Sequence, residues 1–441
     1  MKKQCLGMYS LLSKMFAKFK AFKQRLDATK DWKPLASNFN YLMIMQIANY
    51  IFPLLTIPYL ARVIGVEGFG KIAFATAIIV WFQTITDWGF SYTATRDVAR
   101  NRDNSEKISE IFSNVLWAKS LLALISFIIL FILTEFIPYL KDNQILLFIT
   151  FMLVPAKILF ADWFFQAIEK MKFITIFDLI SKLIFTVCVF LFVKEKSDFI
   201  LQPLFLSLGS ILVGLFSFYL IIFKWNVKLS RPEVKKINKT LKESFDIFIN
   251  SLLPNLYNSL SIVLLGVWSG GIASGIYDAG RKFVGIAHSF MSIFIRVIFP
   301  YLSRDISEHD LFARIHLVVS AVVSLILFLM APFIIKLFFT SEFYEAILVL
   351  QISSISVFLI GLSAVYGTNY LIIKGYEKSL RNITIIYSLI GFIVSIPLVY
   401  NFSYLGAVVS LVLIQALMGF SIMFLAKKVK KEISNKEVDC V

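Results

Sequence analysis

The sequence predicts an all-α integral membrane protein with about 12 transmembrane helices in two six-helix lobes around a central cavity. The first observation is composition: 58% of the 441 residues are hydrophobic, and the mean hydropathy is +0.78. The second is a series of about a dozen apolar stretches between residues 35 and 426, because a helix of about 20 apolar residues crosses a hydrocarbon core. The third is a basic segment, 224–244, that divides these stretches into two sets of six.

The predicted helices follow one another with short connections. The N-terminal lobe, 35–223, contains six of them, near 39–62, 71–94, 113–133, 144–166, 173–193 and 203–223. The C-terminal lobe, 245–426, contains the other six, near 245–268, 275–300, 315–337, 345–373, 380–400 and 404–426. The segment 224–244 is then a linker between the lobes.

The distribution of positive charge predicts which side of the membrane each loop faces. With a cytoplasmic N-terminus, the inner segments hold 32 of the 44 Lys and Arg residues, and the outer segments hold 6. Cytoplasmic loops carry such an excess, so both termini and the linker are predicted to be cytoplasmic. The N-terminal segment, 1–34, contains a basic amphipathic pattern over 8–26 that suits an anionic inner leaflet, with a partly ordered tail as the alternative. The C-terminal segment, 427–441, is a basic cytoplasmic tail.

Two glycine-containing turns indicate that the lobes are diverged repeats. The turn after the first predicted helix runs GVEGFG from Gly65 to Gly70, and the turn after the seventh runs GGIASG from Gly270 to Gly275. A shift of 205 residues superimposes both glycine pairs. With six helices per lobe, an axis along the membrane normal relates the lobes, as in transporters whose substrate site lies between two rocking halves. Chance recurrence of glycine turns is the alternative.

The predicted helix at 275–300 carries a polar stripe that is unusual for a membrane-spanning segment. Its polar positions recur every three or four residues and so share one face: Asp278, Arg281, Gly285, His288, Ser292 and Arg296, with Lys282 beside them. Each ionisable group inside a membrane helix costs about 2.5–3.5 kcal/mol, so we expect the stripe to line a water-filled cavity. Arg281, Lys282 and Arg296 are predicted to bind an anionic group, above all a phosphate. An internal ion pair between Arg281 and Asp278 is the alternative.

Two further helices are predicted to line the same cavity. Gln83 and Asp87 form a polar row on the second helix, and Asn255 and Asn258 lie on the seventh. These are among the first two helices of each lobe, whose polar faces would converge on the cleft. Other charges are interpreted as structural, paired within or between helices or extended toward the interface: Asp178 with Lys182, and Lys119, Lys157 and Asp162.

Several functional classes are disfavoured by what the sequence lacks. Three cysteines and three histidines are scattered, so no metal site is predicted, and no GxxxxGK[ST] loop indicates a nucleotide. We therefore predict no cofactor and no catalytic residue. Nucleic acid is not an expected partner, because the basic residues lie in loops that flank membrane helices.

Four segments resemble bacterial polysaccharide transporters of the multidrug/oligosaccharidyl-lipid/polysaccharide superfamily, specifically the O-antigen and capsule repeat-unit flippases. The run NYIFPLLTIPYLARVIG from Asn49 to Gly65 is similar to their first helix, and GVEGFG to their following turn. The segments DWGF (87–90) and TRDVAR (95–100) are similar to the end of their second helix. Arg62, Gly65, Gly70 and Arg96 lie in these segments and are predicted to act in gating.

The resemblance implies a function and a location. The substrate would be an undecaprenyl-diphosphate-linked oligosaccharide, moved from the inner to the outer leaflet of the bacterial inner membrane for O-antigen, capsule or exopolysaccharide synthesis. Its partners would be the lipid bilayer, a polysaccharide polymerase and a chain-length regulator. The resemblance therefore implies a transporter and not an enzyme.

Two alternatives remain open at this point. The first is a multidrug or small-solute antiporter coupled to a cation, although the first helix lacks the carboxylate that related drug exporters often place there. The second is a membrane glycosyltransferase or polymerase, which needs a catalytic base on an outer loop. Its candidates are Glu135, Asp142, Asp198, Glu342 and Glu345.

Overall fold

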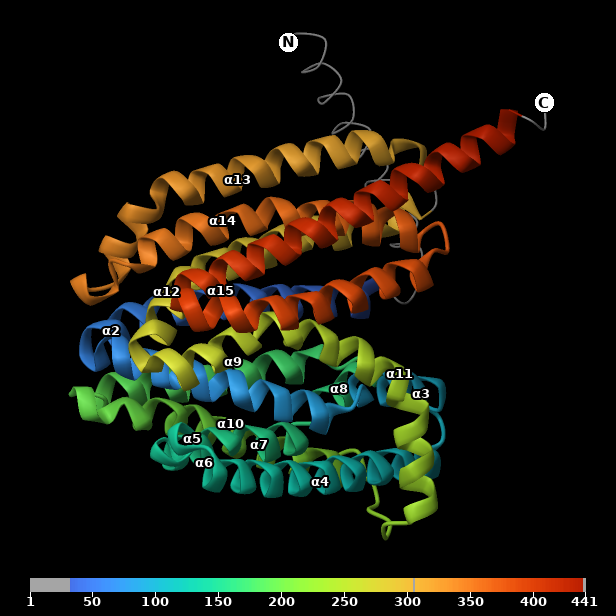
Figure 1. Ribbon diagram of the computed structural model, residues 1–441. Coiled ribbons are helices and arrows are strands. Elements are labelled where there is room, and N and C mark those ends of the chain that lie inside the picture. The colour runs from blue at the N-terminus through green and yellow to red at the C-terminus, as the bar shows by residue number, and fades with distance from the viewer. Residues whose placement is uncertain (1–31, 304–305, 439–441) are drawn as a thin grey trace.

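The computed structural model describes residues 32–303 and 306–438, and helices dominate this part of the chain (Figure 1). The predicted amphipathic segment over 8–26 lies outside the described residues. The first half contains, in chain order, α2 (Trp32–Asp87), α3 (Phe90–Arg100), α4 (Ser105–Phe136), α5 (Pro138–Asp142), α6 (Gln144–Phe151), α7 (Leu153–Leu159), α8 (Asp162–Ala167), α9 (Met171–Phe192), η1 (Lys196–Ile200) and α10 (Leu201–Phe223). The second half contains α11 (Val234–Asn258), α12 (Leu260–Leu302), η2 (Ile306–Glu308), α13 (His309–Phe338), η3 (Ser341–Phe343), α14 (Ala346–Ser363), the π-helix η4 (Ala364–Ile372) and α15 (Glu377–Val438).

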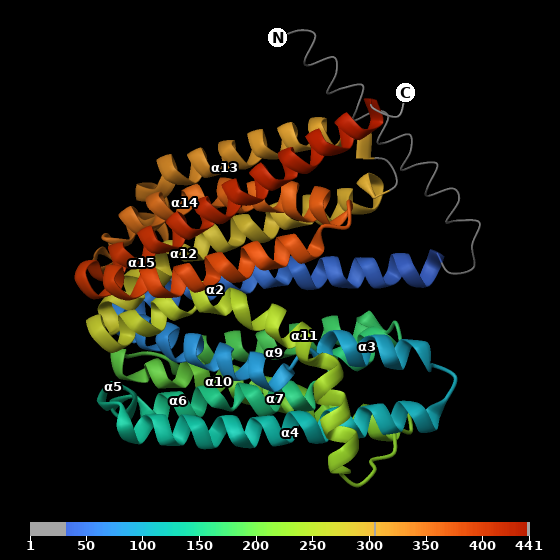
Figure 2. The same cartoon turned by 45° about the vertical axis from the view of Figure 1, so that its right-hand side comes forward.

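The predicted class, an all-helical membrane protein, is confirmed. Within the described residues, nine helices are long and apolar enough to cross a membrane. Three of them contain a single non-helical residue, Gly65 in α2, Gly270 in α12 and Ser403 in α15. Each of these three helices runs out and then back as two arms (Figures 1 and 2). The nine helices therefore comprise more than nine straight arms.

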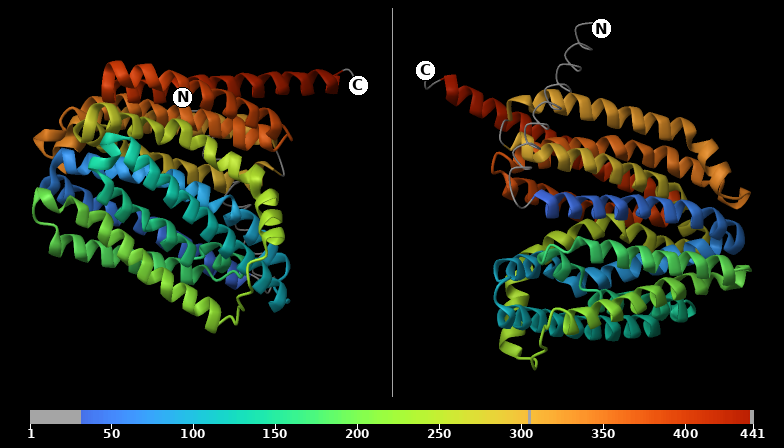
Figure 3. Two further views of the ribbon diagram at one scale, coloured as in Figure 1. Left: turned by 60° about the horizontal axis from the view of Figure 1, so that its bottom comes forward. Right: turned by 180° about the vertical axis from the view of Figure 1, so that it is seen from behind.

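Two predicted boundaries differ from the structure for local reasons. The predicted helix at 144–166 is divided into α6, α7 and α8. Pro155 lies just after the first break and cannot donate a backbone hydrogen bond to the preceding turn. The helix α11 begins at Val234, inside the predicted linker, and not near residue 245. The last turns of α15 carry the predicted basic tail as a helix that extends beyond its neighbours (Figure 3).

The largest buried cluster joins the two halves of the chain where the long helices reverse. Leu60 and Phe69 of α2 pack in it with Leu265 and Tyr277 of α12 and with Phe343 of η3. At the opposite end the halves have separate clusters. One lies among residues 90–237, and two smaller ones lie among residues 295–429. The molecule is therefore closed by apolar packing at the end where its helices reverse.

A contact between small residues makes this closure unusually tight. A Cβ added at Gly70 would lie 1.7 Å from the carbonyl oxygen of Gly271, and one added at Gly275 would lie 2.2 Å from the carbonyl oxygen of Val66. The two contacts are equivalent under the 205-residue shift, which relates Gly70 to Gly275 and Val66 to Gly271. The backbones of α2 and α12 thus meet symmetrically, in an approach that only residues without a side chain permit.

The two hinge glycines support the same correspondence. Gly65 has φ 67° and ψ −179°, and Gly270 has φ 78° and ψ −173°. Both values of φ lie in the region that glycine enters without steric cost. The predicted equivalence of the two turns therefore extends to backbone conformation.

Candidate functional site

Two neighbouring cations of the polar stripe on α12 differ in their partners: Lys282 forms an ion pair and Arg281 does not. The Lys282 ammonium lies 2.8 Å from an Asp278 carboxylate oxygen, and it also lies over the Phe69 ring. The half-buried Arg281 instead donates to the carbonyl oxygen of Asn258 and to the Tyr277 hydroxyl, both at 3.2 Å. Among the described residues no carboxylate pairs with Arg281, so the alternative of an Arg281–Asp278 ion pair is not what the structure contains.

The remaining positions of the stripe face different surroundings. A Cβ added at Gly285 would meet no atom within 4 Å, so this part of α12 borders open space. Arg296 is exposed, and none of the described residues pairs with it. His288 lies 3.2 Å from the Ser356 hydroxyl of α14, and the Ser292 hydroxyl donates to the carbonyl of Ser289. Gly285 and Arg296 are therefore exposed, while His288 and Arg281 are hydrogen-bonded within their own half, Arg281 to neutral acceptors alone.

Arg281 and Arg296 are too far apart to grip one small anion together at close range. They lie fifteen positions apart on one helical arm, which corresponds to about 22 Å of helix at about 1.5 Å per residue. They are better described as two successive cationic positions along α12.

A cavity of about 240 Å³ lies in the first half of the chain. It contains the predicted residues Gln83 and Asp87, and Ser251 of α11 borders it from the second half. Three charged residues interpreted above as structural also line this cavity: Lys119, Lys157 and Asp162. The sequence predicted that Gln83 and Asp87 line a central cavity together with the stripe of α12, but no described residue of α12 lines this cavity. Single charges in apolar helices gave no sign that Lys119, Lys157 and Asp162 would share a cavity with Asp87.

The Asp87 carboxylate anchors the cavity wall. Its Oδ1 lies 2.8 Å from the Lys119 ammonium, and the same oxygen accepts a hydrogen bond from the Ser91 hydroxyl at 2.7 Å. This ion pair joins α2 to α4, with the ammonium buried at 7% exposure and the carboxylate 36% exposed. Lys119 is structural, as predicted, and it also fixes a group that faces the cavity.

The two predicted asparagines of α11 connect the cavity to α12. The Asn255 amide donates to the Thr84 hydroxyl of α2 at 2.8 Å, and Thr84 lines the cavity. One helical turn later, the Asn258 carbonyl accepts from Arg281. The segment Asn255–Asn258 therefore lies between the cavity and the unpaired guanidinium.

The predicted gating residues have unequal surroundings. Arg62 is exposed and forms no ion pair with any described residue, while Arg96 pairs with its neighbour Asp97 at 2.8 Å. Gly70 forms the close contact with α12 described above. Gly65 lies against the Glu342 carboxylate, which would be 2.9 Å from an added Cβ.

Glu342, in η3 of the second half, is a candidate residue for the closed end that the sequence did not single out for gating. Its carboxylate accepts a hydrogen bond from the Val66 backbone N–H at 3.0 Å and lies 3.0 Å from the Lys196 ammonium. The hydrogen bond from Val66, followed by the contact with Lys196, holds the pKa of this carboxyl below its usual 4.5. Glu342 therefore fastens the second half to two segments of the first.

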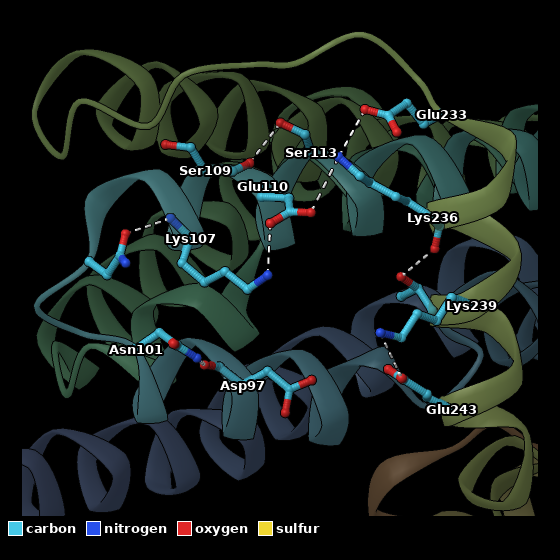
Figure 4. A network of polar contacts seen from close by, with 12 residues as sticks. Asp97, Asn101, Lys107, Ser109, Glu110, Ser113, Glu233, Lys236, Lys239 and Glu243 are labelled. Atoms are coloured by element: carbon cyan, nitrogen blue, oxygen red, sulfur yellow. Dashed lines mark hydrogen bonds and ion pairs between the residues drawn. The ribbon is translucent and has the colours of Figure 1, made fainter.

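At the other end of the molecule, the linker is attached to the first half. The Trp117 indole donates to the Ser230 carbonyl, and the Trp88 indole donates to the Leu241 carbonyl. Figure 4 shows the Glu110 carboxylate of α4 between Lys107 and Lys236. These contacts make the segment from residue 224 to about residue 248 part of the first half. The helix α11 also packs on α15 of the second half.

Comparisons with known proteins place this arrangement among described families. The sequence pattern of the family described as "Polysaccharide biosynthesis protein" matches residues 35–305. A protein of Escherichia coli (strain K12) described as "Putative O-antigen transporter" is 27% identical over 391 residues, which are 87% of this chain and 94% of that protein.

Two solved structures have a similar fold. "Lipid II flippase MurJ, inward closed conformation" has a TM-score of 0.71 at 16% identity, over 89% of this chain and 87% of that chain. An inward-facing multidrug resistance MATE family transporter of the MOP superfamily has a TM-score of 0.62 at 14% identity, over 87% of this chain and 96% of that chain.

Proposed function

Because the chain belongs to the polysaccharide biosynthesis protein family, we propose that it is a flippase for undecaprenyl-diphosphate-linked oligosaccharides. It is a multi-pass membrane transporter and not an enzyme. In the proposed cycle it carries repeat units from the inner to the outer leaflet of a bacterial inner membrane, for O-antigen, capsule or exopolysaccharide synthesis. A polysaccharide polymerase and a chain-length regulator would receive the product.

The observation that carries this proposal is the unpaired guanidinium of Arg281. It is half-buried on a helix long and apolar enough to span a membrane, and only neutral acceptors bind it among the described residues. An unpaired charge at that depth is costly, which favours an anionic ligand. A diphosphate suits it, because a guanidinium can donate two parallel hydrogen bonds to phosphate oxygens.

The diphosphate is proposed to use the two cationic positions of α12 in succession. Arg296, exposed and nearer the cytoplasmic end, makes the first contact, and Arg281 makes the second. Lys282 adds positive charge beside Arg281, although Asp278 shares that charge. Polar residues of α2 and α11 contact the glycan, and the polyprenyl tail stays in the lipid.

The closure at one end supports a cycle of alternating access. We propose twelve membrane crossings, six in each of the lobes 35–223 and 245–426. The two arms of α2, α12 and α15 count separately. The first crossing of the second lobe is formed by α11 together with the first arm of α12. The Lys and Arg distribution supports cytoplasmic termini. The end closed by Gly70, Gly275 and Glu342 then faces outward, so the described state would receive substrate from the cytoplasmic side.

A double charge reversal tests the proposed site. Arg281→Glu with Arg296→Glu should abolish surface polysaccharide while the protein still reaches the membrane, measured by glycan blotting and membrane immunoblotting in a deletion strain. The matched control is Arg231→Glu with Arg314→Glu, two exposed arginines without a described partner, which should restore polysaccharide. Normal polysaccharide in the first variant would contradict the site, and unchanged polysaccharide in the deletion strain itself would contradict the function.

A cation-coupled drug antiporter is the second candidate. The shared fold with a MATE family transporter and the carboxylates Asp87 and Asp162 in one cavity favour it. That function predicts lower drug tolerance on deletion, with surface glycan unaffected. Three of the five outer acidic candidates are already bound, which argues against a catalytic role for them: Glu135 pairs with Lys141, Glu342 pairs with Lys196, and Asp198 accepts two backbone N–H groups.

A further inference from the structure

We propose that the cavity between α2, α4, α7, α8 and α11 binds a single uncharged sugar residue, the one attached to the diphosphate. This inference rests on the proposed function and assigns a ligand to a cavity that the function alone leaves open. The cavity volume is about 240 Å³, below the usual range of about 300–1,000 Å³ for sites that enclose drug-sized ligands. One pyranose ring is a ligand of suitable size, and a longer glycan would have to extend out of the opening.

The charges of the cavity favour a neutral ligand. Two carboxylates, Asp87 and Asp162, and two ammonium groups, Lys119 and Lys157, line it, so their formal charges cancel. Lys119 is already bound by Asp87 at 2.8 Å. A diphosphate placed here would face both carboxylates, and a cation would face Lys157, which no described carboxylate pairs with.

The hydrogen-bonding groups left open in the cavity are both donors and acceptors. Both hydrogen bonds to Asp87 reach Oδ1, which leaves Oδ2 without a described partner. Asp162 has one bond, from the Trp163 N–H to Oδ1, and the Lys157 ammonium and the Gln83 amide have none among the described residues. Neighbouring sugar hydroxyls need this combination, because each hydroxyl donates one hydrogen bond and accepts others.

Thr86 provides an independent indication that the cavity is built for a polar ligand. Its side chain is 4% exposed and lines the cavity, yet its hydroxyl oxygen has no hydrogen-bond partner among the described residues. A buried polar group without a partner costs about 1–3 kcal/mol. A ligand hydroxyl in the cavity would supply the missing partner.

The position of the cavity relative to Arg281 agrees with a sugar next to a diphosphate. Thr84, in the cavity wall, binds Asn255, and Asn258 binds Arg281. Asn255 and Asn258 are separated by three residues of one helix, a rise of about 4.5 Å. A head group on Arg281 therefore has its first sugar within reach of the cavity mouth.

The experiment compares two lipids on the full-length protein in nanodiscs. The probes are undecaprenyl diphosphate and the same lipid bearing one N-acetylhexosamine or hexose, with Kd measured by native mass spectrometry. The wild-type protein should bind a sugar-bearing lipid at least fivefold more tightly than the bare lipid. Thr86→Val, which removes only an unpartnered hydroxyl, should reduce that preference at least threefold. Asp162→Asn with Lys157→Gln should remove it.

Control variants separate a sugar site from a structural effect. Asp103→Asn with Lys172→Gln neutralises two exposed charges without a described partner and should leave both affinities unchanged. Arg281→Gln should weaken both lipids equally. Equal binding of the two lipids by the wild-type protein, or an unchanged preference in Thr86→Val, would overturn the sugar site alone. Binding of neither lipid would overturn the proposed function together with this assignment.

Discussion

The Glu342 carboxylate and the Val66 backbone N–H are hydrogen-bonded at 3.0 Å across 276 residues of chain. Val66 is the first residue after the reversal of α2, where backbone N–H groups have no partner within the helix. A glutamate from the second half thus caps a helix arm of the first half. This bond forms only when the two halves meet, so it stabilises the closed end specifically.

Removing the cap should open that end. Glu342→Ala should shift the equilibrium toward the open state by about fivefold, which corresponds to about 1 kcal/mol for a partly exposed charged hydrogen bond. Spin labels at the exposed positions Asp142 and Tyr344 would report a longer distance in double electron–electron resonance. Lys196→Gln retains the bond to Val66 and should have a smaller effect. An unchanged distance distribution in Glu342→Ala would contradict the capping role.

Low pH should open the closed end, as Glu342→Ala is expected to do. The pKa of the Glu342 carboxyl is below its usual 4.5 in the closed state, through Val66 first and Lys196 second, and it returns toward 4.5 when the contact opens. Because the pKa is lower in the closed state, the ionised carboxylate stabilises that state fully at pH values above 4.5. This stabilisation is lost as the pH falls through the lowered pKa of the closed state. The label distance should therefore lengthen only well below pH 4.5. Glu342→Gln should abolish this pH dependence, and a transition nearer neutrality would implicate another group.

A methyl group at the glycine contact should prevent closure. Gly70→Ala places a Cβ 1.7 Å from the Gly271 carbonyl oxygen, so the backbones of α2 and α12 must separate. We expect at least a tenfold loss of complementing activity with normal membrane insertion. Gly285→Ala adds the same atom where nothing lies within 4 Å and should leave the outer closure intact in the spin-label experiment. A closed distance in Gly70→Ala would show that the contact is not required.

The Asp87–Lys119 ion pair should respond asymmetrically to mutation. Asp87→Asn leaves an ammonium that is 7% exposed without a carboxylate, whereas Lys119→Met leaves a carboxylate that is 36% exposed. The first change should cost about 2 kcal/mol of stability and the second less. Thermal unfolding in detergent would measure both. The double variant should be more stable than Asp87→Asn alone, and additive losses would argue against direct coupling.

The sequence predicted features that repeat along one helix better than contacts between helices. Helical spacing located the polar row of α2 and the stripe of α12, and the Asp178–Lys182 pair is confirmed. The partner of Asp278 is Lys282, four residues away, and not Arg281, three residues away. Spacing allows either pair, and the contacts of Arg281 with Tyr277 and Asn258 decide between them.

Glu342 and the charged cavity were missed as sites for a different reason. Lys119, Lys157 and Asp162 come from three helices whose relative rotation is set by packing. Glu342 was noticed only as an outer-loop acid, because its bond reaches a backbone N–H, which has no residue-specific signal. Contacts of this kind depend on how the two halves pack against each other, and local sequence patterns do not predict that packing.

The backbone contact between Gly70 and Gly271 has a consequence for the permeability of the membrane. A seal made of long side chains can yield gradually, because rotamers change as helices separate. A seal made of main-chain atoms has no such adjustable part, and dispersion attraction falls steeply within about 1 Å of separation. At this contact the proposed outer end is therefore either shut or parted, which would shorten the time during which ions leak through the proposed glycan pathway.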